Sequence, residues 1–303
     1  MYLLVVGGGG YLGREIVNQA IRLRWKVVSL SLNKKKMNST NHKNVKHFFI
    51  DLTKKNKLLF LKKYKFDYVV NVSGYVDHRN FSKKNNNIIR NHLESLINVV
   101  SILNRSKLKR FLHVGSSDEY GVKNKLQYED DREDPQTPYA FSKVAITHFL
   151  QMMNWSENYP ITILRVFLVY GPGQDNNRLI PYTINNCLKD KKFELSDGSQ
   201  VRDFTYIDDV IGAIFACIKS KTANGNIYNV GTGKGYSVKY VVKLIQSIIG
   251  KGKPDFGKIK NIRKENQNLV AQTKKIKKDL KWSAKTKLVN GINITIKSYN
   301  EQD

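Results

Sequence analysis

The chain has 303 residues, of which 41% are hydrophobic and 25% are charged, and its formal net charge is +27. This composition is ordinary for a globular protein that buries a sizeable core. No apolar run approaches the ~20 residues of a membrane span, and the N-terminal apolar run is too short for a signal peptide. The two cysteines, Cys187 and Cys217, form no C-x-x-C pair and no metal-ligand spacing. We therefore expect reduced thiols, no metal site and a cytoplasmic location.

The excess of positive charge allows two interpretations. One is an anionic partner, such as nucleic acid, a membrane surface or a phosphorylated ligand. The other is a solvated surface that is rich in Lys and Asn. The lysine run at residues 34–36 has no interleaved aromatic residues, which a base-stacking groove would need. We favour the surface interpretation and expect neither a nucleic-acid partner nor a membrane partner.

The first half of the sequence alternates strand-like and helix-like segments. Short apolar runs predict parallel strands at residues 2–6, 26–32, 45–50, 67–72, 109–114 and 161–167. Helices are predicted between them, most clearly at 12–23, 88–104 and 138–154. Strands that alternate with helices imply right-handed crossovers. The predicted fold is therefore α/β, with a Rossmann-type doubly wound parallel sheet.

The alternation ends after residue 173. Helices are predicted near 180–188, 208–219, 238–249, 274–280 and 288–299, with one short strand at 227–230. We interpret this half as a smaller C-terminal substrate-binding domain that interleaves with the first domain and covers its ligand. The predicted dinucleotide-binding domain comprises 1–169 and about 203–231, and the predicted substrate domain comprises 170–202 and 232–303.

Four consecutive glycines separate the first predicted strand from the first predicted helix. Gly7, Gly10 and Gly13 satisfy the pattern G-x-x-G-x-x-G. Glycine permits the tight turn and lets the backbone approach a pyrophosphate, while the helix N-terminus offers free N–H groups. We therefore expect a dinucleotide to be bound by Gly7, Gly10, Tyr11, Leu12 and Gly13.

The end of the second predicted strand bears on the choice of dinucleotide. An NAD site usually has Asp or Glu there to bind the ribose hydroxyls, whereas this stretch contains Ser31, Asn33 and Lys34. A hydroxyl, an amide and lysines suit a 2′-phosphate better, so NADP(H) is favoured and NAD(H) is the alternative. After the third strand, Asp51 and Leu52 are placed to contact adenine. Helix capping is the other role open to Asp51.

A Tyr-x-x-x-Lys pattern lies at the start of the helix predicted at 138–154, so Tyr139 and Lys143 share one helix face. A phenol titrates near ~10 and is a poor acid or base at neutral pH. A neighbouring ammonium would lower the pKa of Tyr139, which could then exchange a proton at a carbonyl while Lys143 also holds the nicotinamide ribose. Ser116 follows a predicted strand at the ligand-binding edge of the sheet. It is suited to bond the same substrate oxygen or to cap a turn.

Several motifs together resemble one family. They are the N-terminal glycine loop, Ser116-Ser117…Tyr120-Gly121, Pro138-Tyr139…Ser142-Lys143, Leu164-Arg165 through Tyr170-Gly171-Pro172-Gly173, Arg202-Asp203-Phe204, Tyr228-Asn229-Val230-Gly231 and Leu280-Lys281-Trp282. The chain resembles the extended short-chain dehydrogenase/reductase superfamily. Within it, the chain resembles the NAD-dependent epimerase/dehydratase family, whose members modify nucleotide sugars. The resemblance covers nearly the whole chain.

The resemblance implies roles for the matching positions. Ser116, Tyr139 and Lys143 would be the catalytic residues. Asn71 and Ser73 would line the cofactor, braced by Asn91 from the following helix. The substrate, a nucleotide sugar, would be contacted by Ser117, Asp118, Arg202 and Arg263, with the two arginines on its diphosphate. The helices that contain Asn91 and Tyr139 often form a dimer bundle in this family, so a homodimer is expected.

Departures from the family pattern refine the expected activity. Dehydratases carry an Asp-Glu pair directly after the catalytic Ser or Thr, whereas here Ser117 intervenes before Asp118 and Glu119. Leu168 stands where many members have an Asn that touches the substrate phosphate. These departures, together with the lack of an acidic residue at the end of the second strand, favour an NADP(H)-dependent reductase. Its substrate would be the C4 keto group of a nucleotide-linked 4-keto-6-deoxy sugar, and the reaction would be a step in deoxysugar synthesis. The alternatives are an NAD-dependent 4-epimerase, a 4,6-dehydratase and, in another class, a non-catalytic nucleotide- or RNA-binding protein.

Overall fold

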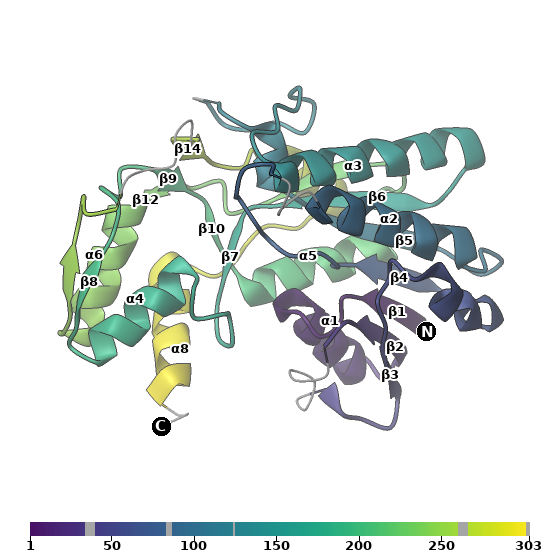
Figure 1. Cartoon of the computed structure of the whole chain (residues 1–303), viewed down its shortest axis with the longest axis horizontal. Helices are drawn as coiled ribbons and strands as arrows, with labels where there is room; N and C mark the ends of the chain where they lie inside the picture. Colours follow the sequence, from purple (N-terminus) through teal and green to yellow (C-terminus); the bar gives the residue numbers. More distant parts are fainter. Residues whose placement is uncertain (34–39, 83–86, 124, 260–265, 301–303) are drawn as a thin grey trace.

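A computed structural model describes residues 1–33, 40–82, 87–123, 125–259 and 266–300 of the chain (Figure 1). Two of the predicted ligand-contacting residues, Lys34 and Arg263, lie outside these ranges. None of the helices in the described part of the chain is both long and apolar enough to cross a bilayer. Within the same residues, no group of His, Cys, Asp and Glu side chains is arranged to hold a metal ion.

The apolar runs of the first half form a parallel sheet, as predicted. Its seven strands follow the order β11 (Ile227–Val230), β6 (Ile161–Val166), β5 (Arg110–Ser116), β4 (Tyr68–Asn71), β1 (Tyr2–Val6), β2 (Lys26–Ser31) and β3 (Val45–Phe49). All neighbouring pairs are parallel. The order reverses between β1 and β4, which is the crevice where open α/β sheets bind their ligands. The Rossmann-type doubly wound fold is confirmed.

Helices cover both faces of the sheet, because alternate residues of each strand point to opposite sides. In β1, Leu3 and Val5 belong to one buried cluster, while Leu4 and Val6 belong to another. The first face is covered by α1 (Tyr11–Arg22) and α5 (Ile207–Lys219), and the second by η2 (Lys55–Lys63), α2 (Asn87–Ile102) and α3 (Pro138–Glu157).

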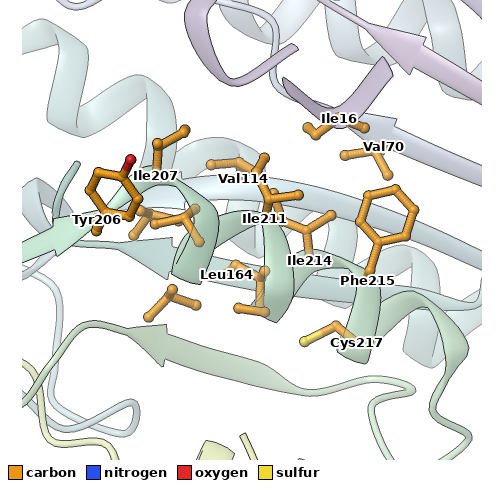
Figure 2. Close-up of a cluster of buried hydrophobic side chains, with 14 of the residues drawn as sticks. Ile16, Val70, Val114, Leu164, Tyr206, Ile207, Ile211, Ile214, Phe215 and Cys217 are labelled. Carbon is orange, nitrogen blue, oxygen red and sulfur yellow. The ribbon is translucent and has the colours of Figure 1, made fainter. Parts of the chain in front are cut away.

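Figure 2 shows how α5 contributes to the first cluster. Ile207, Ile211 and Ile214 point from the helix toward Val114 and Leu164 of the sheet. Each of these side chains is at most 6% exposed, and burial of a side chain of this size contributes about 1.5–3 kcal/mol. This packing holds the strands in the register that places the site residues at their carboxyl ends.

The rest of the chain forms a second layer of helices and short strands. The helices are α4 (Leu179–Leu188), α6 (Val238–Ile249), α7 (Lys274–Leu280) and α8 (Leu288–Asn300). Figure 1 shows α4, α6 and α8 at the end of the molecule that is remote from the N-terminus, whereas α7 packs against β11 of the main sheet. Small sheets pair β7 (Leu168–Tyr170) with β10 (Phe204–Tyr206), β9 (Val201–Arg202) with β12 (Tyr236–Ser237) and β14 (Asn268–Leu269), and β8 (Lys192–Glu194) with β13 (Lys253–Asp255). These strands of two or three residues are too short for any sequence period to predict.

The C-terminal segment is tied back to the helix that covers the main sheet. Asp209, in the first turn of α5, accepts hydrogen bonds from Lys285 N and Thr286 N, both at 2.9 Å. At the same time β11 returns to the edge of the main sheet beside β6. The smaller layer therefore interleaves with the Rossmann layer, as predicted from the sequence. The residue limits given above for the two domains stay a prediction.

Candidate active site

The glycine loop between β1 and α1 has the geometry of a phosphate cradle. Gly7 has a φ of +92°, and a Cβ there would lie 2.8 Å from Ser73 N. A Cβ on Gly13 would lie 2.1 Å from Gly7 O, so the loop closes tightly against the helix. Gly10 precedes α1 with no side-chain cap, and the first turn of α1 has no acidic residue. The helix N-terminus, which carries Tyr11 and Leu12, therefore keeps N–H groups and a partial positive charge for an anion, which fits a dinucleotide pyrophosphate.

The end of β2 lies against this loop. A Cβ on Gly9 would come within 2.3 Å of Ser31 Oγ, so the serine touches the glycine backbone. Ser31 Oγ donates a hydrogen bond to Asn33 O at 3.3 Å. The residues that the structure describes at this end of β2 thus present a hydroxyl and an amide next to the loop, and no carboxylate.

The other predicted cofactor residues lie after β3 and β4. Asp51 Oδ1 accepts hydrogen bonds from Thr53 N and Thr53 Oγ1 at 3.0 and 2.7 Å, which lowers the pKa of Asp51. Asp51 thus stabilises the turn that contains it. The N-cap of η2 is Lys54, so Asp51 does not cap that helix. Asn98 Nδ2, from α2, donates to Leu52 O at 3.0 Å.

After β4, Asn71 Oδ1 accepts hydrogen bonds from Ser73 N and Ser73 Oγ. From α2, His92, the neighbour of Asn91, joins this region to α3, and the bracing role of Asn91 stays a prediction. His92 Nε2 accepts from Tyr75 N at 3.1 Å, while its Nδ1 lies 2.9 Å from Ser142 Oγ in α3. Burial, with a smaller effect of Lys143, lowers the pKa of His92 to about 3, so its ring is neutral.

The three predicted catalytic residues lie together where β5 meets α3. Ser116 is the last residue of β5 and the N-cap of η3 (Ser117–Tyr120), so it fills the capping role as well as facing the site. Thr137 caps α3 just before Tyr139. Lys143 Nζ lies 5.9 Å from the centre of the Tyr139 ring and donates to Val114 O at 3.0 Å. That bond fixes the ammonium between β5 and α3.

The pKa of Tyr139 differs from the sequence expectation. Tyr139 is only 7% exposed. Burial, and then the charge of Asp118, raise the pKa of its phenol well above the ordinary value, and a hydrogen bond with Ser116 opposes them. Burial also lowers the pKa of Lys143 to about 8. The pKa of Tyr139 is therefore raised in the folded chain and not lowered as predicted, because desolvation of the phenol dominates. The phenol is protonated at neutral pH.

Asp118 lies in the site, near an imidazole and three basic side chains. Its Oδ2 is 3.8 Å from Nδ1 of His78, whose ring meets the ring of Tyr139 edge-on at 5.7 Å. The positive charges of Arg202, Arg178 and Lys143 each act to lower the pKa of Asp118. Burial outweighs these cations and raises the pKa of Asp118.

Glu119 points away from the site into the core. It is fully buried, and its Oε2 forms an ion pair with Nε of the equally buried Arg165 at 2.9 Å. Oε1 accepts from Ser116 N at 2.8 Å, and Oε2 also accepts from Thr147 Oγ1 at 2.9 Å. Glu119 therefore joins β5, α3 and β6, and it does not line the site.

The described substrate residues divide between η3, just after β5, and the second layer. Ser117 is 5% exposed and follows Ser116 directly, while Arg202 is 9% exposed in β9. His78 and Arg178, which the sequence analysis did not single out, belong to the same site. Arg178 is the N-cap of α4. Neither residue belongs to a spaced motif, so only the folded chain reveals its position beside Asp118.

Comparison with known proteins assigns the chain to a family. The sequence model of the NAD dependent epimerase/dehydratase family matches residues 3–231. The UDP-glucose 4-epimerase of Lactobacillus helveticus is 24% identical over 320 residues, which cover 97% of this chain and 96% of that protein. The dTDP-D-glucose 4,6-dehydratase of Dictyostelium discoideum is 30% identical over 201 residues, or 62% of this chain. The match spans only about half of that relative, 46% of its length.

Solved structures show the same fold. The UDP-glucuronic acid 4-epimerase from Bacillus cereus, in complex with UDP-glucuronic acid and NAD, matches with a TM-score of 0.90 and 24% identity over 100% of both chains. The family match covers well over half of the sequence and includes the glycine loop, Ser116, Tyr139 and Lys143. The chain thus belongs to the NAD-dependent epimerase/dehydratase family, whose relatives here are nucleotide-sugar epimerases and dehydratases.

Proposed function

We propose that this enzyme reduces the C4 keto group of a nucleotide-linked 4-keto-6-deoxy sugar, as a step in deoxysugar synthesis. The observation that carries the proposal is the arrangement of the acid–base groups: Ser116 bonds Tyr139, Lys143 lies beside its ring, and Glu119 is turned into the core. The phenol of Tyr139 is protonated at neutral pH, so it has a proton to give to a carbonyl oxygen, although burial and Asp118 raise its pKa and make it a weaker acid. Reduction of a ketone requires a proton donor at the carbonyl oxygen, whereas oxidation of an alcohol requires a base there.

The cofactor of this proposal is NADP(H), with NAD(H) as the alternative. The uncapped N-terminus of α1 at Gly10 would hold the pyrophosphate. Ser31 and Asn33 supply no carboxylate that would repel a 2′-phosphate. A bound nicotinamide would supply the hydride to C4. Relatives in solved structures bind NAD, so the preference for NADP(H) rests on the end of β2 alone.

Side chains of the protein would bind, orient and protonate the substrate oxygen. Tyr139 would donate its proton to the carbonyl oxygen, and Ser116 would bond the same oxygen and orient it. Lys143, fixed by Val114 O, would stabilise the phenolate that forms. Arg202, together with Arg178, would bind the diphosphate of the nucleotide sugar.

The position of Glu119 supports a reductase over a dehydratase. A dehydratase needs two carboxyl groups at the sugar, one to remove a proton and one to protonate the leaving hydroxyl. In this chain Glu119 is held in its ion pair with Arg165, so Asp118 alone of the pair faces Tyr139.

The test is to mix the purified enzyme with NADPH, and separately with NADH, and a panel of 4-keto-6-deoxy sugars on different nucleotides. Loss of reduced-nicotinamide absorbance that Tyr139→Phe slows by about 10²–10⁴-fold supports the proposal. Retention of NADPH affinity by Tyr139→Phe shows that the variant is folded. Purified enzyme that carries tightly bound NAD and consumes no NADPH contradicts the proposal.

A 4-epimerase is the second candidate. One relative that spans nearly the whole chain is a UDP-glucose 4-epimerase, and an epimerase uses the same Ser, Tyr and Lys with a cofactor that is recycled in each turnover. Interconversion of UDP-glucose and UDP-galactose without added NADPH would favour it. For either activity we propose a cytoplasmic homodimer, in line with the free, buried thiols of Cys187 and Cys217.

A further inference from the structure

Four lysines project from one side of the short helix α7. Three lie at positions i, i+3 and i+4, and the fourth follows at i+7 as the C-cap, so they share one helix face. With Ser283 they line an open hollow of about 520 Å³, which we call the lysine hollow. This volume falls within the usual range of ligand sites. The four residues, all of them exposed, are Lys274, Lys277, Lys278 and Lys281.

The opposite side of α7 is anchored on the protein. Ile276 is fully buried in the main core cluster. Lys275 Nζ donates a hydrogen bond to Ile227 O of β11 at 2.9 Å, and Asp279 Oδ2 accepts one from Tyr228 OH at 3.0 Å. The lysine hollow is therefore carried by a helix that is fixed against the edge strand of the main sheet.

The positive charges of the lysine hollow are not compensated by acidic side chains. Other exposed lysines form ion pairs, as Lys125 does with Asp131 and Lys192 does with Asp255. In the part of the chain that the structure describes, none of the four lysines of the hollow belongs to an ion pair. The one acidic residue of α7, Asp279, is turned toward β11 instead.

Helix stability does not account for this arrangement. Like charges at i, i+3 and i, i+4 repel each other and destabilise a helix. Lys274 is the first residue of α7, where the helix dipole disfavours a cation, and only Lys277 and Lys278 lie in the last turn, where the dipole favours one. A bound anion would relieve the repulsion among all four ammonium groups.

The lysine hollow is separate from the active site. Helix α7 packs against β11, which is the edge strand of the seven-stranded sheet. Strands β6, β5 and β4 lie between β11 and the crevice at β1, where the dinucleotide is expected. An anion in the lysine hollow therefore does not compete with the phosphates of the cofactor.

We propose that the lysine hollow is a second anion site, which binds the phosphate chain of a soluble oligophosphate such as a triphosphate. A lysine ammonium is a point charge that binds phosphate oxygens well. The lining side chains include no aromatic ring on which a base could stack, so the phosphate chain alone is recognised. A concave surface receives a compact anion better than a flat membrane. This inference does not depend on the proposed reaction.

Calorimetric titration with inorganic tripolyphosphate tests the proposal. Saturating NADPH or NADH, whichever binds more tightly, is present to fill the glycine loop, and Arg202→Gln should keep the affinity of the wild type for tripolyphosphate. A variant with Gln in place of all four lysines of the hollow should bind tripolyphosphate roughly tenfold or more weakly. Its unfolding in urea should need at least as much denaturant as that of the wild type, because repulsion within α7 is removed.

The matched control removes the same charge from exposed lysines of the Rossmann layer and should bind like the wild type. Its four Lys→Gln substitutions are at Lys43, Lys46, Lys62 and Lys65. Equal weakening in the control would overturn the proposal, because net charge alone would then explain the binding. A wild type that binds no tripolyphosphate would overturn it as well.

Two further arms distinguish the source of the phosphates and the size of the ligand. We expect ATP and tripolyphosphate to bind with similar affinity, and a preference for ATP of more than tenfold would contradict recognition of the phosphate chain alone. Single-stranded RNA and vesicles of anionic lipid are titrated in the same way. If either binds through the four lysines while tripolyphosphate does not, the hollow is part of a larger interaction surface and the proposal is wrong.

Discussion

The hydroxyl of Ser31 ends β2 and touches Gly9 of the phosphate loop. NAD sites usually place an acid at this point to bind the ribose hydroxyls. Ser31→Asp should therefore repel a 2′-phosphate and favour the unphosphorylated ribose. We expect the ratio of NADPH to NADH affinity to fall roughly tenfold or more, about 1.4 kcal/mol, in fluorescence titrations. Ser31→Ala adds no charge and should keep the wild-type ratio. An unchanged ratio in Ser31→Asp would show that this end of β2 does not contact the ribose.

The carboxyl of Asp118 gives a pH dependence with a defined sign. Burial raises its folded-state pKa above the ordinary 3.8, so the folded protein binds this proton more tightly than the unfolded chain. Ionisation of Asp118 as the pH rises above about 4 therefore costs more in the folded protein than in the unfolded chain, and it lowers the free energy of unfolding. Asp118→Asn removes this titration, so its stability relative to the wild type should increase from about pH 3 to about pH 7 in urea unfolding.

The matched control is Asp51, whose pKa is lowered by hydrogen bonds from Thr53. A carboxyl with a lowered pKa stabilises the folded protein once it is ionised, so Asp51→Asn should lose stability relative to the wild type over the same pH range. Parallel pH profiles for the two variants would refute the assignment of opposite shifts.

Individual residues show which parts of the site can be predicted from the sequence and which cannot. The glycines, and Tyr139 with Lys143, were predictable because their spacing is a property of a local turn or of one helix face. Asp118 and Glu119 are neighbours in the chain, yet one enters the site and the other the core. That choice depends on Arg165, which is 46 residues away in sequence. The pKa of Tyr139 was likewise beyond the sequence, since desolvation depends on everything packed around the ring.

At the scale of elements, Glu119 joins β5, α3 and β6 through one buried carboxylate. Glu119→Gln keeps the shape of the side chain and removes its charge, which leaves Arg165 buried and less compensated. We expect the free energy of unfolding in urea to fall by about 3–5 kcal/mol. Glu94→Gln breaks only the exposed pair with Arg90 and should cost less than about 1 kcal/mol. Similar losses in the two variants would contradict the role assigned to Glu119.

The elements of the first half followed closely from the sequence, because buried parallel strands are short apolar runs bounded by turns and the helices between them are amphipathic. The strand predicted at 109–114 extends in the structure to Ser116, which carries the catalytic hydroxyl to the edge of the sheet. The small sheets of the second half were not predicted. β9 and β12 have two residues each and exist through pairing with distant segments, which no local pattern encodes. The register that sets Tyr236 opposite Arg202 is therefore visible only in the folded chain.

At the scale of the whole molecule, the outer face of α3 predicts how two copies associate. Phe141, Met152 and Trp155 are 49%, 48% and 89% exposed, and Ile97 of the neighbouring α2 is 38% exposed. Several large apolar side chains exposed on two neighbouring helices indicate a protein–protein contact. We expect a homodimer through α2 and α3 in light-scattering measurements, and Met152→Lys should dissociate it. Val289→Lys, on the exposed side of α8, should leave the dimer intact. A monomeric wild type would contradict this arrangement.

The most direct test of the central claim is the fate of a labelled hydride. NADPH that carries deuterium at the transferable position is mixed with a 4-keto-6-deoxy nucleotide sugar, and the product is examined by mass spectrometry and NMR. We expect deuterium at C4 of the product with the wild type and almost none with Tyr139→Phe. A product without deuterium, formed by interconversion of sugars on bound NAD, would contradict it and identify an epimerase.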